Sequence, residues 1–252
     1  MKTASWISLA LGAAGAAAGL GAYAVNGRSS SLLAPSVWHG PREHPTYALT
    51  FDDGPSESTP RLLDLLDFHG VKATFFLLGA NVRRLPGIAR EILLRGHEVG
   101  NHGDRHPYYC FQAPRFVYSD IVFGQREIED ALGFSPWLFR PPFGLRWPGM
   151  REAQRDCGLV GVQWSVMGRD WRLGANGIAQ RLADGVEPGA ILCLHDGREL
   201  AVDPDIHHTI TAVRAFLLHR ATEELKPVTV SALFAPELFL EAEALAGVPE
   251  AR

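Results

Sequence analysis

From Thr46 onward, short apolar runs alternate with longer stretches that have helical periodicity. The apolar runs are bounded by Gly, Pro, Asp or Ser, a pattern typical of buried strands. We expect strands at residues 47–51, 73–78, 98–101, 137–140, 159–166, 190–194 and 228–231. We expect helices at residues 59–68, 86–95, 117–132, 148–156, 178–185 and 206–219. Strands that alternate with helices predict βαβ units and a parallel sheet.

Residues that commonly end helices support this prediction. The segment 59–68 carries Leu62, Leu63, Leu65 and Leu66 and is followed by Gly70, a residue that commonly ends helices. The number of strand–helix units favours a distorted (β/α)7 barrel in the α/β class, although the pattern alone leaves an open sheet possible. A chain of 252 residues suits one such domain.

The N-terminal segment differs from the rest of the chain. Lys2 precedes an uncharged Ala- and Gly-rich stretch, 4–25, that contains the cleavage-like sequence Ala22-Tyr23-Ala24. The stretch has about the length of a membrane span, roughly 20 residues, so both a cleaved signal peptide and an anchor remain open. Either way we expect an exported domain, periplasmic, extracellular or held at the outer face of the cytoplasmic membrane. The expected organisation is a signal or anchor at 1–28, a linker at 29–45, a catalytic domain at 46–235 and a tail at 236–252.

Composition narrows the function only a little. The formal net charge is −4, with 46% hydrophobic and 21% charged residues, and no basic run points to nucleic-acid binding. The three cysteines, Cys110, Cys157 and Cys193, form no C-x-x-C pair, so neither a disulfide framework nor a zinc knuckle is indicated. We interpret them as small buried hydrophobic residues. We expect a monomer.

Polar residues gather directly after the expected strands. In a parallel barrel the carboxyl ends of the strands share one rim, where catalytic side chains lie. Five of the expected strands deliver Asp, His or Arg to that rim, at residues 52–53, 102–106, 140, 170 and 195–196. This clustering predicts an active site on the rim.

Asp52 and Asp53 are neighbours, and neighbouring side chains on a strand point in opposite directions. Both can face one site only where the strand breaks, and Gly54-Pro55 supplies a turn there. Two carboxylates this close repel each other unless a cation or a shared proton relieves them.

His102 and His106 stand four residues apart, a spacing that on a helical turn lets both imidazoles grip one metal. Two His and one carboxylate leave coordination positions open for water and substrate, as in catalytic zinc sites. Fe²⁺, Co²⁺ or Ni²⁺ also suit such a ligand set, so Zn²⁺ is the first expectation among several.

Five segments together resemble the signatures of the polysaccharide deacetylases, carbohydrate esterase family 4, also called the NodB-homology domain. They occur in the family's order and span roughly residues 46–234. The segments are Thr50-Phe51-Asp52-Asp53-Gly54-Pro55, His102-x-x-x-His106, Arg140-Pro141-Pro142-Phe143-Gly144, Asp170-Trp171 and Ile191-Leu192-Cys193-Leu194-His195-Asp196.

The resemblance implies a division of chemical roles. Asp53, His102 and His106 would bind the metal, while Asp52 would be the general base and His195 the general acid. The implied reaction removes N-acetyl groups from an amino-sugar polysaccharide or oligosaccharide.

The resemblance also implies supporting residues. Arg140 would hold the base in place, and Asp170 would orient the acid. Trp171 and Leu194 would line the pocket for the acetyl methyl group, and the backbone amide of Phe143 would assist the oxyanion.

Three positions depart from the family pattern. Gly103 stands where Ser or Thr usually follows the first His, which removes a hydroxyl expected to brace the metal loop. Met167 stands where an earlier acidic residue is frequent, and Phe143 replaces a frequent Tyr.

Several alternatives remain. The same fold serves other C–N bonds, such as those of formamides or cyclic imides, and an O-acetyl xylan esterase or an inactive carbohydrate-binding module is also compatible. A glycosidase is disfavoured, because the adjacent Asp52 and Asp53 do not readily flank a glycosidic bond at the roughly 5 Å or more required. Peptidoglycan, chitin-type oligomers, exopolysaccharides and acetylated xylan all remain candidate substrates.

Overall fold

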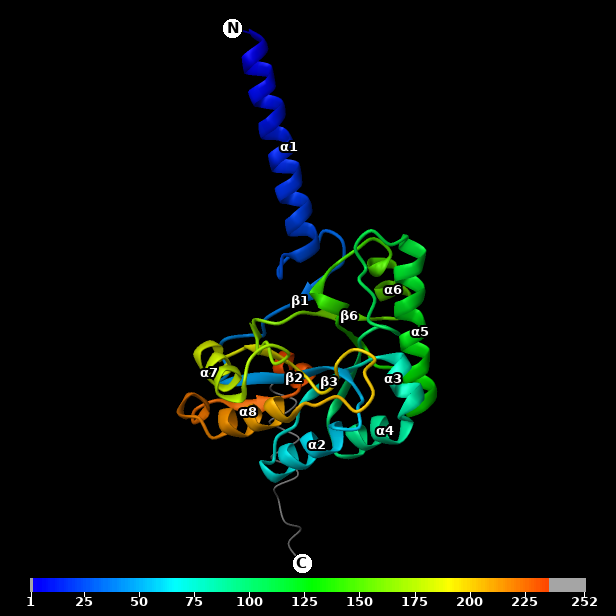
Figure 1. Cartoon of the computed structure of the whole chain (residues 1–252), viewed down its shortest axis with the longest axis vertical. Coiled ribbons are helices and arrows are strands. Elements are labelled where there is room, and N and C mark those ends of the chain that lie inside the picture. Colours follow the sequence, from blue (N-terminus) through cyan, green and yellow to red (C-terminus); the bar gives the residue numbers. More distant parts are fainter. Residues whose placement is uncertain (1, 236–252) are drawn as a thin grey trace, which may run out of the picture.

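The computed structural model describes residues 2–235, with side chains from residue 12 onward, so the tail expected at 236–252 lies outside the described residues. A sheet of parallel strands runs through the domain (Figure 1). The strands are β1 (Ser36–Val37), β2 (Thr46–Gly54), β3 (Thr74–Leu77), β4 (Glu98–Asn101), β5 (Leu138–Phe139), β6 (Val160–Val162), β7 (Val166–Met167), β8 (Ile191–His195) and β9 (Lys226–Val228). Their order is β1-β6-β5-β4-β3-β2-β8-β7, with β9 beside the start of β2.

The strand order matches a barrel with one gap. Strands β2 to β6 are successive neighbours, and β8 and β7 continue the sheet on the other side of β2. Strand β1 adds to the outer edge of β6, and within residues 2–235 no pairing joins β1 to β7, so the barrel is open between β1 and β7. This arrangement confirms the predicted distorted α/β barrel.

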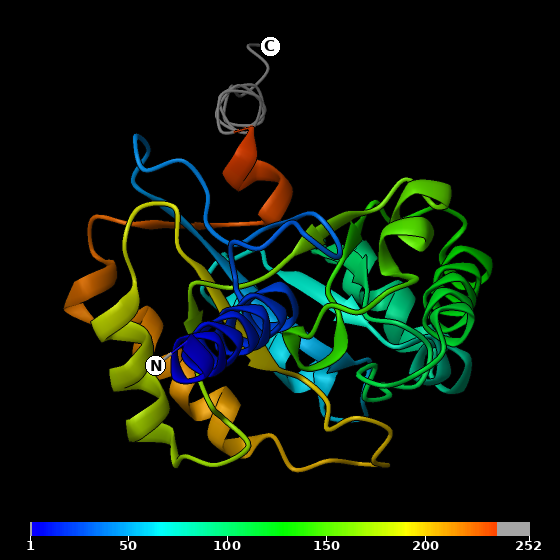
Figure 2. The same ribbon diagram turned by 90° about the horizontal axis from the view of Figure 1, so that it is seen from above.

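Helices surround the sheet. They are α1 (Lys2–Asn26), α2 (Thr59–Phe68), α3 (Gly79–Arg84), α4 (Pro86–Leu94), α5 (Pro114–Leu132), α6 (Met150–Asp156), α7 (Ala175–Gly185), α8 (His207–Leu217) and α9 (Val230–Phe234), with short 3₁₀ turns η1 (Pro142–Gly144) and η2 (Arg220–Thr222). Figure 2 shows α7 and α8 on one flank of the sheet and α5 and α6 on the other.

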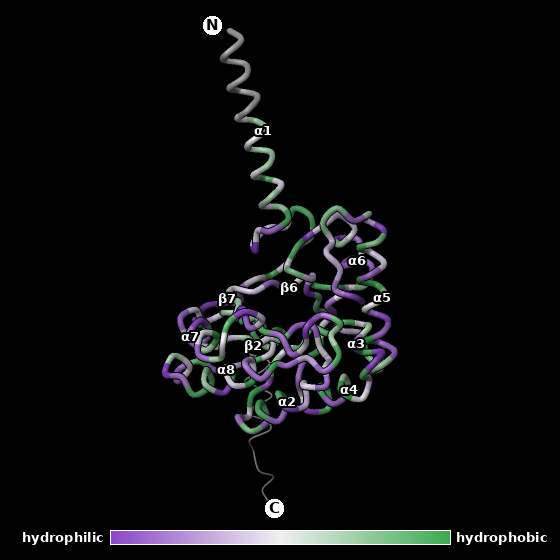
Figure 3. The backbone as a smooth tube through the Cα atoms, viewed as in Figure 1, coloured by the Kyte–Doolittle hydropathy of each residue, from purple (hydrophilic) through white to green (hydrophobic). Residues whose placement is uncertain are grey.

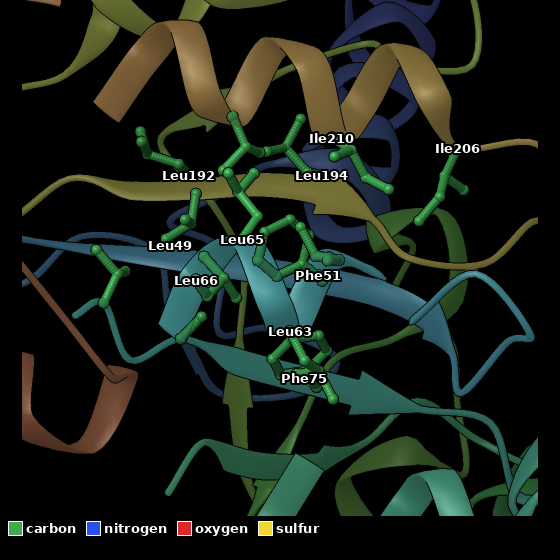
Figure 4. Packing of buried hydrophobic residues seen from close by; sticks show 14 of the residues in the cluster. Leu49, Phe51, Leu63, Leu65, Leu66, Phe75, Leu192, Leu194, Ile206 and Ile210 are labelled. Carbon is green, nitrogen blue, oxygen red and sulfur yellow. The ribbon is translucent and has the colours of Figure 1, made fainter. Parts of the chain in front are cut away.

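Strand alternation sorts side chains between two layers. On β2 and β8, Leu49, Phe51, Leu192 and Leu194 face outward and pack against the helices, including Leu65 of α2 (Figure 4). The alternate residues of the same strands face the barrel interior, because successive side chains on a strand point to opposite faces. The barrel interior is apolar near the starts of β2 and β8. The polar residues expected from the sequence lie at the carboxyl ends of these strands, on the rim.

Two expected strands have different ends in the structure. The strand expected at 159–166 is divided into β6 and β7, because β6 pairs with β1 and β5 whereas β7 pairs with β8 on the other side of the opening. The strand expected at 228–231 ends at Val228, because Thr229 caps α9 by accepting a hydrogen bond from the amide of Ala232.

The segment 29–45, expected as a linker, contributes β1, which pairs with β6. The buried Arg146 fixes the preceding residues, because its guanidinium donates to the carbonyls of Gly27 and Arg28 at 2.7 and 2.9 Å. The domain limits stay predictions, but this segment packs against the barrel over part of its length.

Helix α1 projects from the domain (Figure 1). Its residues 12–25 are all apolar or small, as the white to green trace in Figure 3 shows. In the described part of the chain, none of the helices combines the length and apolarity that a membrane crossing requires. The signal or anchor expected at 1–28 stays a prediction.

Candidate active site

A cavity of about 450 Å³ opens at the carboxyl ends of the strands. It is lined by Asp52, Asp53, His102, His106, Phe143, Trp164, Met167, Trp171, Cys193, His195, Arg198 and Glu199. Seven of the ten site residues expected from the sequence are among them. Arg140 and Asp170 lie directly behind this lining, and Leu194 faces away from it.

Asp53, His102 and His106 bring three potential ligand atoms to within 4.8 Å of one another. Asp53 Oδ1 lies 3.5 Å from His102 Nε2 and 3.4 Å from His106 Nε2. Ligand bonds of about 2.0–2.1 Å at tetrahedral angles separate ligand atoms by about 3.3–3.4 Å, so the set fits a zinc-sized ion. Asp53 Oδ1 is buried without a hydrogen-bond partner, which is costly unless a cation satisfies it.

The protonation states of these groups suit a cation. Burial alone would raise the pKa of Asp53, but the adjacent His102 ring and the nearby imidazoles of His195 and His106 hold that pKa below its usual range. Burial, together with His102, lowers the pKa of His106 to about 4. Asp53 is therefore ionised and His106 neutral near pH 7, as metal ligands must be.

His102 and His106 do not lie on a helical turn, and the loop 102–106 that carries them is called the metal loop below. Residues 102–106 follow β4 as a loop, with Gly103 at φ 84° and His106 at φ 59°. Nδ1 of His102 donates to the carbonyl of Arg140 at 2.7 Å, which leaves Nε2 free to face Asp53. The spacing of the two histidines thus predicted that their rings lie close together, but not the backbone that brings them together.

A different pair of side chains supports the loop where the family's hydroxyl is missing. Asp120 Oδ2 accepts hydrogen bonds from the amide of Asp104 at 3.1 Å and from the hydroxyl of Tyr109 at 2.8 Å. A Cβ on Gly103 would lie 2.6 Å from Asp120 Oδ2 and 2.9 Å from the Tyr109 oxygen. The space beside Gly103 is therefore filled by Asp120 and Tyr109, which sequence reasoning missed.

The adjacent aspartates share the site because β2 bulges between them. The register with β3 shifts between Asp52 and Gly54, and Asp53 adopts φ 73°. The expected break therefore lies at Asp53 itself, one residue before the expected turn.

Asp52 is held from two sides. Its Oδ1 accepts a hydrogen bond from Nη1 of the fully buried Arg140 at 2.7 Å, and its Oδ2 lies 3.4 Å from the Cys193 sulfur. The Arg140 guanidinium also donates to Thr50 at 2.6 Å and lies 4.1 Å from the centre of the Phe76 ring. This network fixes Asp52 as a carboxylate acceptor facing the cavity.

His195 is paired with Asp170. The distance from Nδ1 to Asp170 Oδ1 is 2.8 Å, and Thr209 donates to the other carboxylate oxygen at 2.7 Å. Burial by itself lowers the pKa of His195, but the Asp170 carboxylate outweighs this and the pKa rises to about 9. His195 is therefore protonated near neutral pH and can donate a proton.

The lining of the cavity differs from one expectation, that Leu194 lines the pocket. Leu194 is fully buried in the outer core between sheet and helices, because it alternates with the inward residues of β8. Cys193 lines the cavity instead. Trp171 stands edge-on to the His195 ring, with 5.2 Å between centres, and Phe143 lies 4.5 Å from the His106 ring.

The fold and this constellation define an α/β-barrel protein whose cavity combines a candidate metal-ligand set with Asp52 and His195. The family model "Polysaccharide deacetylase" matches residues 39–162. The chain is 40% identical over 169 residues to a peptidoglycan-N-acetylglucosamine deacetylase of Listeria monocytogenes, covering 66% of this chain and 35% of the relative. It is 39% identical over 152 residues to a chitooligosaccharide deacetylase of a Bradyrhizobium species, and the match covers 59% of this chain and 69% of that relative.

The solved structure of a peptidoglycan N-acetylglucosamine deacetylase, crystallised with a hydroxamate-type compound, superposes with a TM-score of 0.72 at 30% identity. The match covers 79% of this chain and 92% of that one. The chain belongs to the polysaccharide deacetylase family. It spans about a third of the length of the Listeria relative.

Proposed function

We propose that this protein is a metal-dependent N-deacetylase acting on an N-acetylated amino-sugar glycan. One observation carries the proposal: a candidate metal-ligand set, an arginine-held carboxylate and an imidazole paired with a carboxylate face a single cavity. Amide hydrolysis by a metal-activated water uses a metal ion, a base and an acid, and these three elements would supply them.

Asp53, His102 and His106 would hold the ion, with Zn²⁺ as the first choice and Co²⁺, Ni²⁺ or Fe²⁺ as alternatives. When bound, the ion polarises the amide carbonyl and makes a neighbouring water more acidic.

Asp52 acts as the general base in this scheme. Its Oδ1 is occupied by Arg140 at 2.7 Å, so Oδ2 is the oxygen available to accept a proton from the attacking water. Arg140 holds the carboxylate in one orientation through this hydrogen bond.

His195 acts as the general acid. An amine leaves an amide poorly unless it is protonated, and His195 carries a proton because its pKa is about 9. Asp170 fixes the ring through Nδ1, so Nε2 is the nitrogen that donates to the leaving amine. The backbone amide of Phe143 is proposed to assist the oxyanion, and Trp171 to contact the acetyl group.

The names of the relatives guide the choice of the proposed substrate. One is called a peptidoglycan-N-acetylglucosamine deacetylase and another a chitooligosaccharide deacetylase. We propose an N-acetylglucosamine-containing glycan of the cell envelope. We place the domain outside the cytoplasmic membrane, because the apolar stretch 4–25 suits export or anchoring. The monomer expected from the sequence stays a prediction.

Acetate release from peptidoglycan, chitooligosaccharides and acetylated xylan tests this proposal. We expect release from an amide sugar that is lost with chelator and restored by Zn²⁺. Asp52→Asn and His195→Ala should nearly abolish release while still binding the metal, whereas the exposed controls Asp130→Asn and His208→Ala should match the wild type. Release only from xylan, or release unaffected by chelator, would contradict the proposal.

A further inference from the structure

Two sulfur-containing side chains on neighbouring strands line the cavity. Met167 on β7 and Cys193 on β8 are direct partners in the parallel register. Their neighbours Val166 and Leu192 are also partners, and both pack in the outer core. Because side chains alternate along a strand, Met167 and Cys193 both face inward, and both line the cavity.

The sulfur of Cys193 belongs to a compact group of donors. Atoms of Asp52, Cys193 and His195 lie within 4.8 Å of one another. The Cys193 sulfur is 3.4 Å from Asp52 Oδ2. His195 uses Nδ1 to contact Asp170, so its Nε2 remains as the donor on the cavity side. This group is separate from the set Asp53, His102 and His106, with which it shares no ligand.

The sulfur atoms of Cys193 and Met167 are soft metal ligands. A thiolate and a thioether with an imidazole match the preference of copper(I), whereas carboxylate and water ligands suit harder cations. Two of these donors stand at positions that the catalytic scheme does not use: Met167 replaces a frequent acidic residue, and Cys193 faces the cavity in place of the expected Leu194.

Charge favours a monovalent ion. Arg140 lies 2.7 Å from Asp52, and a divalent ion at Asp53 would add further positive charge to the same cavity. A second divalent ion would therefore meet stronger repulsion than a monovalent one.

We propose that Cys193 and Met167, together with Asp52 and His195, form a second metal site that binds copper(I). Binding converts the Cys193 thiol to a thiolate and the protonated His195 ring to a neutral imidazole: the S–H and Nε2–H bonds break, S–Cu and N–Cu bonds form, and both protons leave to solvent, with no change in oxidation state. Burial and the Asp52 carboxylate raise the pKa of the free Cys193 thiol, so the thiol stays protonated until a soft cation displaces its proton.

Occupancy of this site removes the two groups that the proposed reaction needs. Asp52 would be bound to copper instead of water, and His195 would no longer offer a proton. Copper(I) is therefore an inhibitor that does not compete for the ligands of the first metal. Only this inhibition rests on the proposed function; the site itself does not.

Binding is tested on the full chain without substrate. Cu⁺ is added anaerobically to protein preloaded with Zn²⁺. A chromophoric chelator then competes with the protein for Cu⁺, and its absorbance gives the affinity of the protein for Cu⁺. We expect Cys193→Ser to weaken Cu⁺ binding by more than the roughly 10- to 100-fold that losing a supporting residue costs at metal sites. Met167→Leu should weaken it by a smaller factor. Cys110→Ser and Met150→Leu, which alter buried sulfur residues outside the cavity, should bind as the wild type does.

X-ray absorption of the bound copper identifies its neighbours directly. Two sulfur neighbours are expected in the wild type and one in Met167→Leu. Circular dichroism and retained Zn²⁺ show whether each variant is folded, so a misfolded variant is recognised and replaced by Cys193→Ala. Equal Cu⁺ retention in folded wild type and Cys193→Ser, or a copper shell without sulfur, would overturn the site. Copper bound through sulfur in a protein that releases no acetate would leave the site standing and reject only the deacetylase proposal.

Discussion

The backbone carbonyl of Arg140 accepts a hydrogen bond from Nδ1 of His102 at 2.7 Å. The side chain of the same arginine donates to Asp52, also at 2.7 Å. One residue therefore sets the tautomer of the proposed metal ligand His102 with its main chain and the orientation of the proposed base Asp52 with its side chain. Because the carbonyl survives any substitution, variants at this position separate the two roles.

Arg140→Leu leaves the Asp52 carboxylate buried without its partner. We expect the free energy of unfolding to fall by about 3–5 kcal/mol, the usual cost of breaking a buried ion pair. Arg140→Lys should keep most of the stability but lose more than about tenfold in turnover, because one ammonium cannot reproduce the guanidinium geometry. Urea unfolding and acetate release measure both effects, with the exposed Arg115→Leu as control. Loss of bound metal in a folded Arg140→Lys would contradict the separation of roles.

Asp170→Asn should change the pH dependence of the reaction. The carboxylate raises the pKa of His195 to about 9, so the wild-type rate should fall only above that pH, where the general acid loses its proton. Without the carboxylate the alkaline limb of kcat/KM should move to lower pH. The pair also stabilises the fold below the ordinary His pKa of about 6.5, and this contribution is lost as pH rises through about 9. An unchanged alkaline limb in a folded variant would refute the assignment.

The rule that side chains gather at the carboxyl ends of parallel strands predicted which polar residues come together. Asp52, His102 and His195 follow or end separate strands that the apolar pattern predicted, and all three line one cavity. Helix α2 begins and ends as expected, because its leucines mark one face and Gly70 follows its end. These features depend on local periodicity and on one general rule of parallel barrels.

Features that depend on backbone irregularity or tertiary contact could not be predicted. The bulge at Asp53 and the left-handed φ of His106 leave no sequence pattern. Asp120 reaches the metal loop only because α5 packs beside it, as its hydrogen bond to Asp104 shows. Leu194 was placed in the pocket by the resemblance, whereas the alternation of β8 assigns that face to Cys193.

Zn²⁺ binding should distinguish the two neighbouring aspartates. An ion that binds only the folded state adds about 4 kcal/mol of stability at a concentration 1,000 times Kd. We expect this gain, measured as a rise in Tm on adding Zn²⁺, in the wild type and in Asp52→Asn. Asp53→Asn should lose most of it, because Asp53 Oδ1 is the buried oxygen between the two imidazoles. Equal shifts in Asp53→Asn and the wild type would place the ion elsewhere.

Gly103→Ala should loosen the metal loop. Its Cβ would meet Asp120 Oδ2 at 2.6 Å, and the residue must keep φ 84°. We expect a loss of about 1–3 kcal/mol in the free energy of unfolding, together with weaker Zn²⁺ binding. Gly133→Ala is a matched control, because Gly133 has φ 74° with open space around its Cβ position, so it reports the backbone cost alone. Zn²⁺ competition with a chromophoric chelator should show weaker binding for Gly103→Ala only. If both variants bind Zn²⁺ as tightly as the wild type does, Asp120 and Tyr109 do not brace the metal loop.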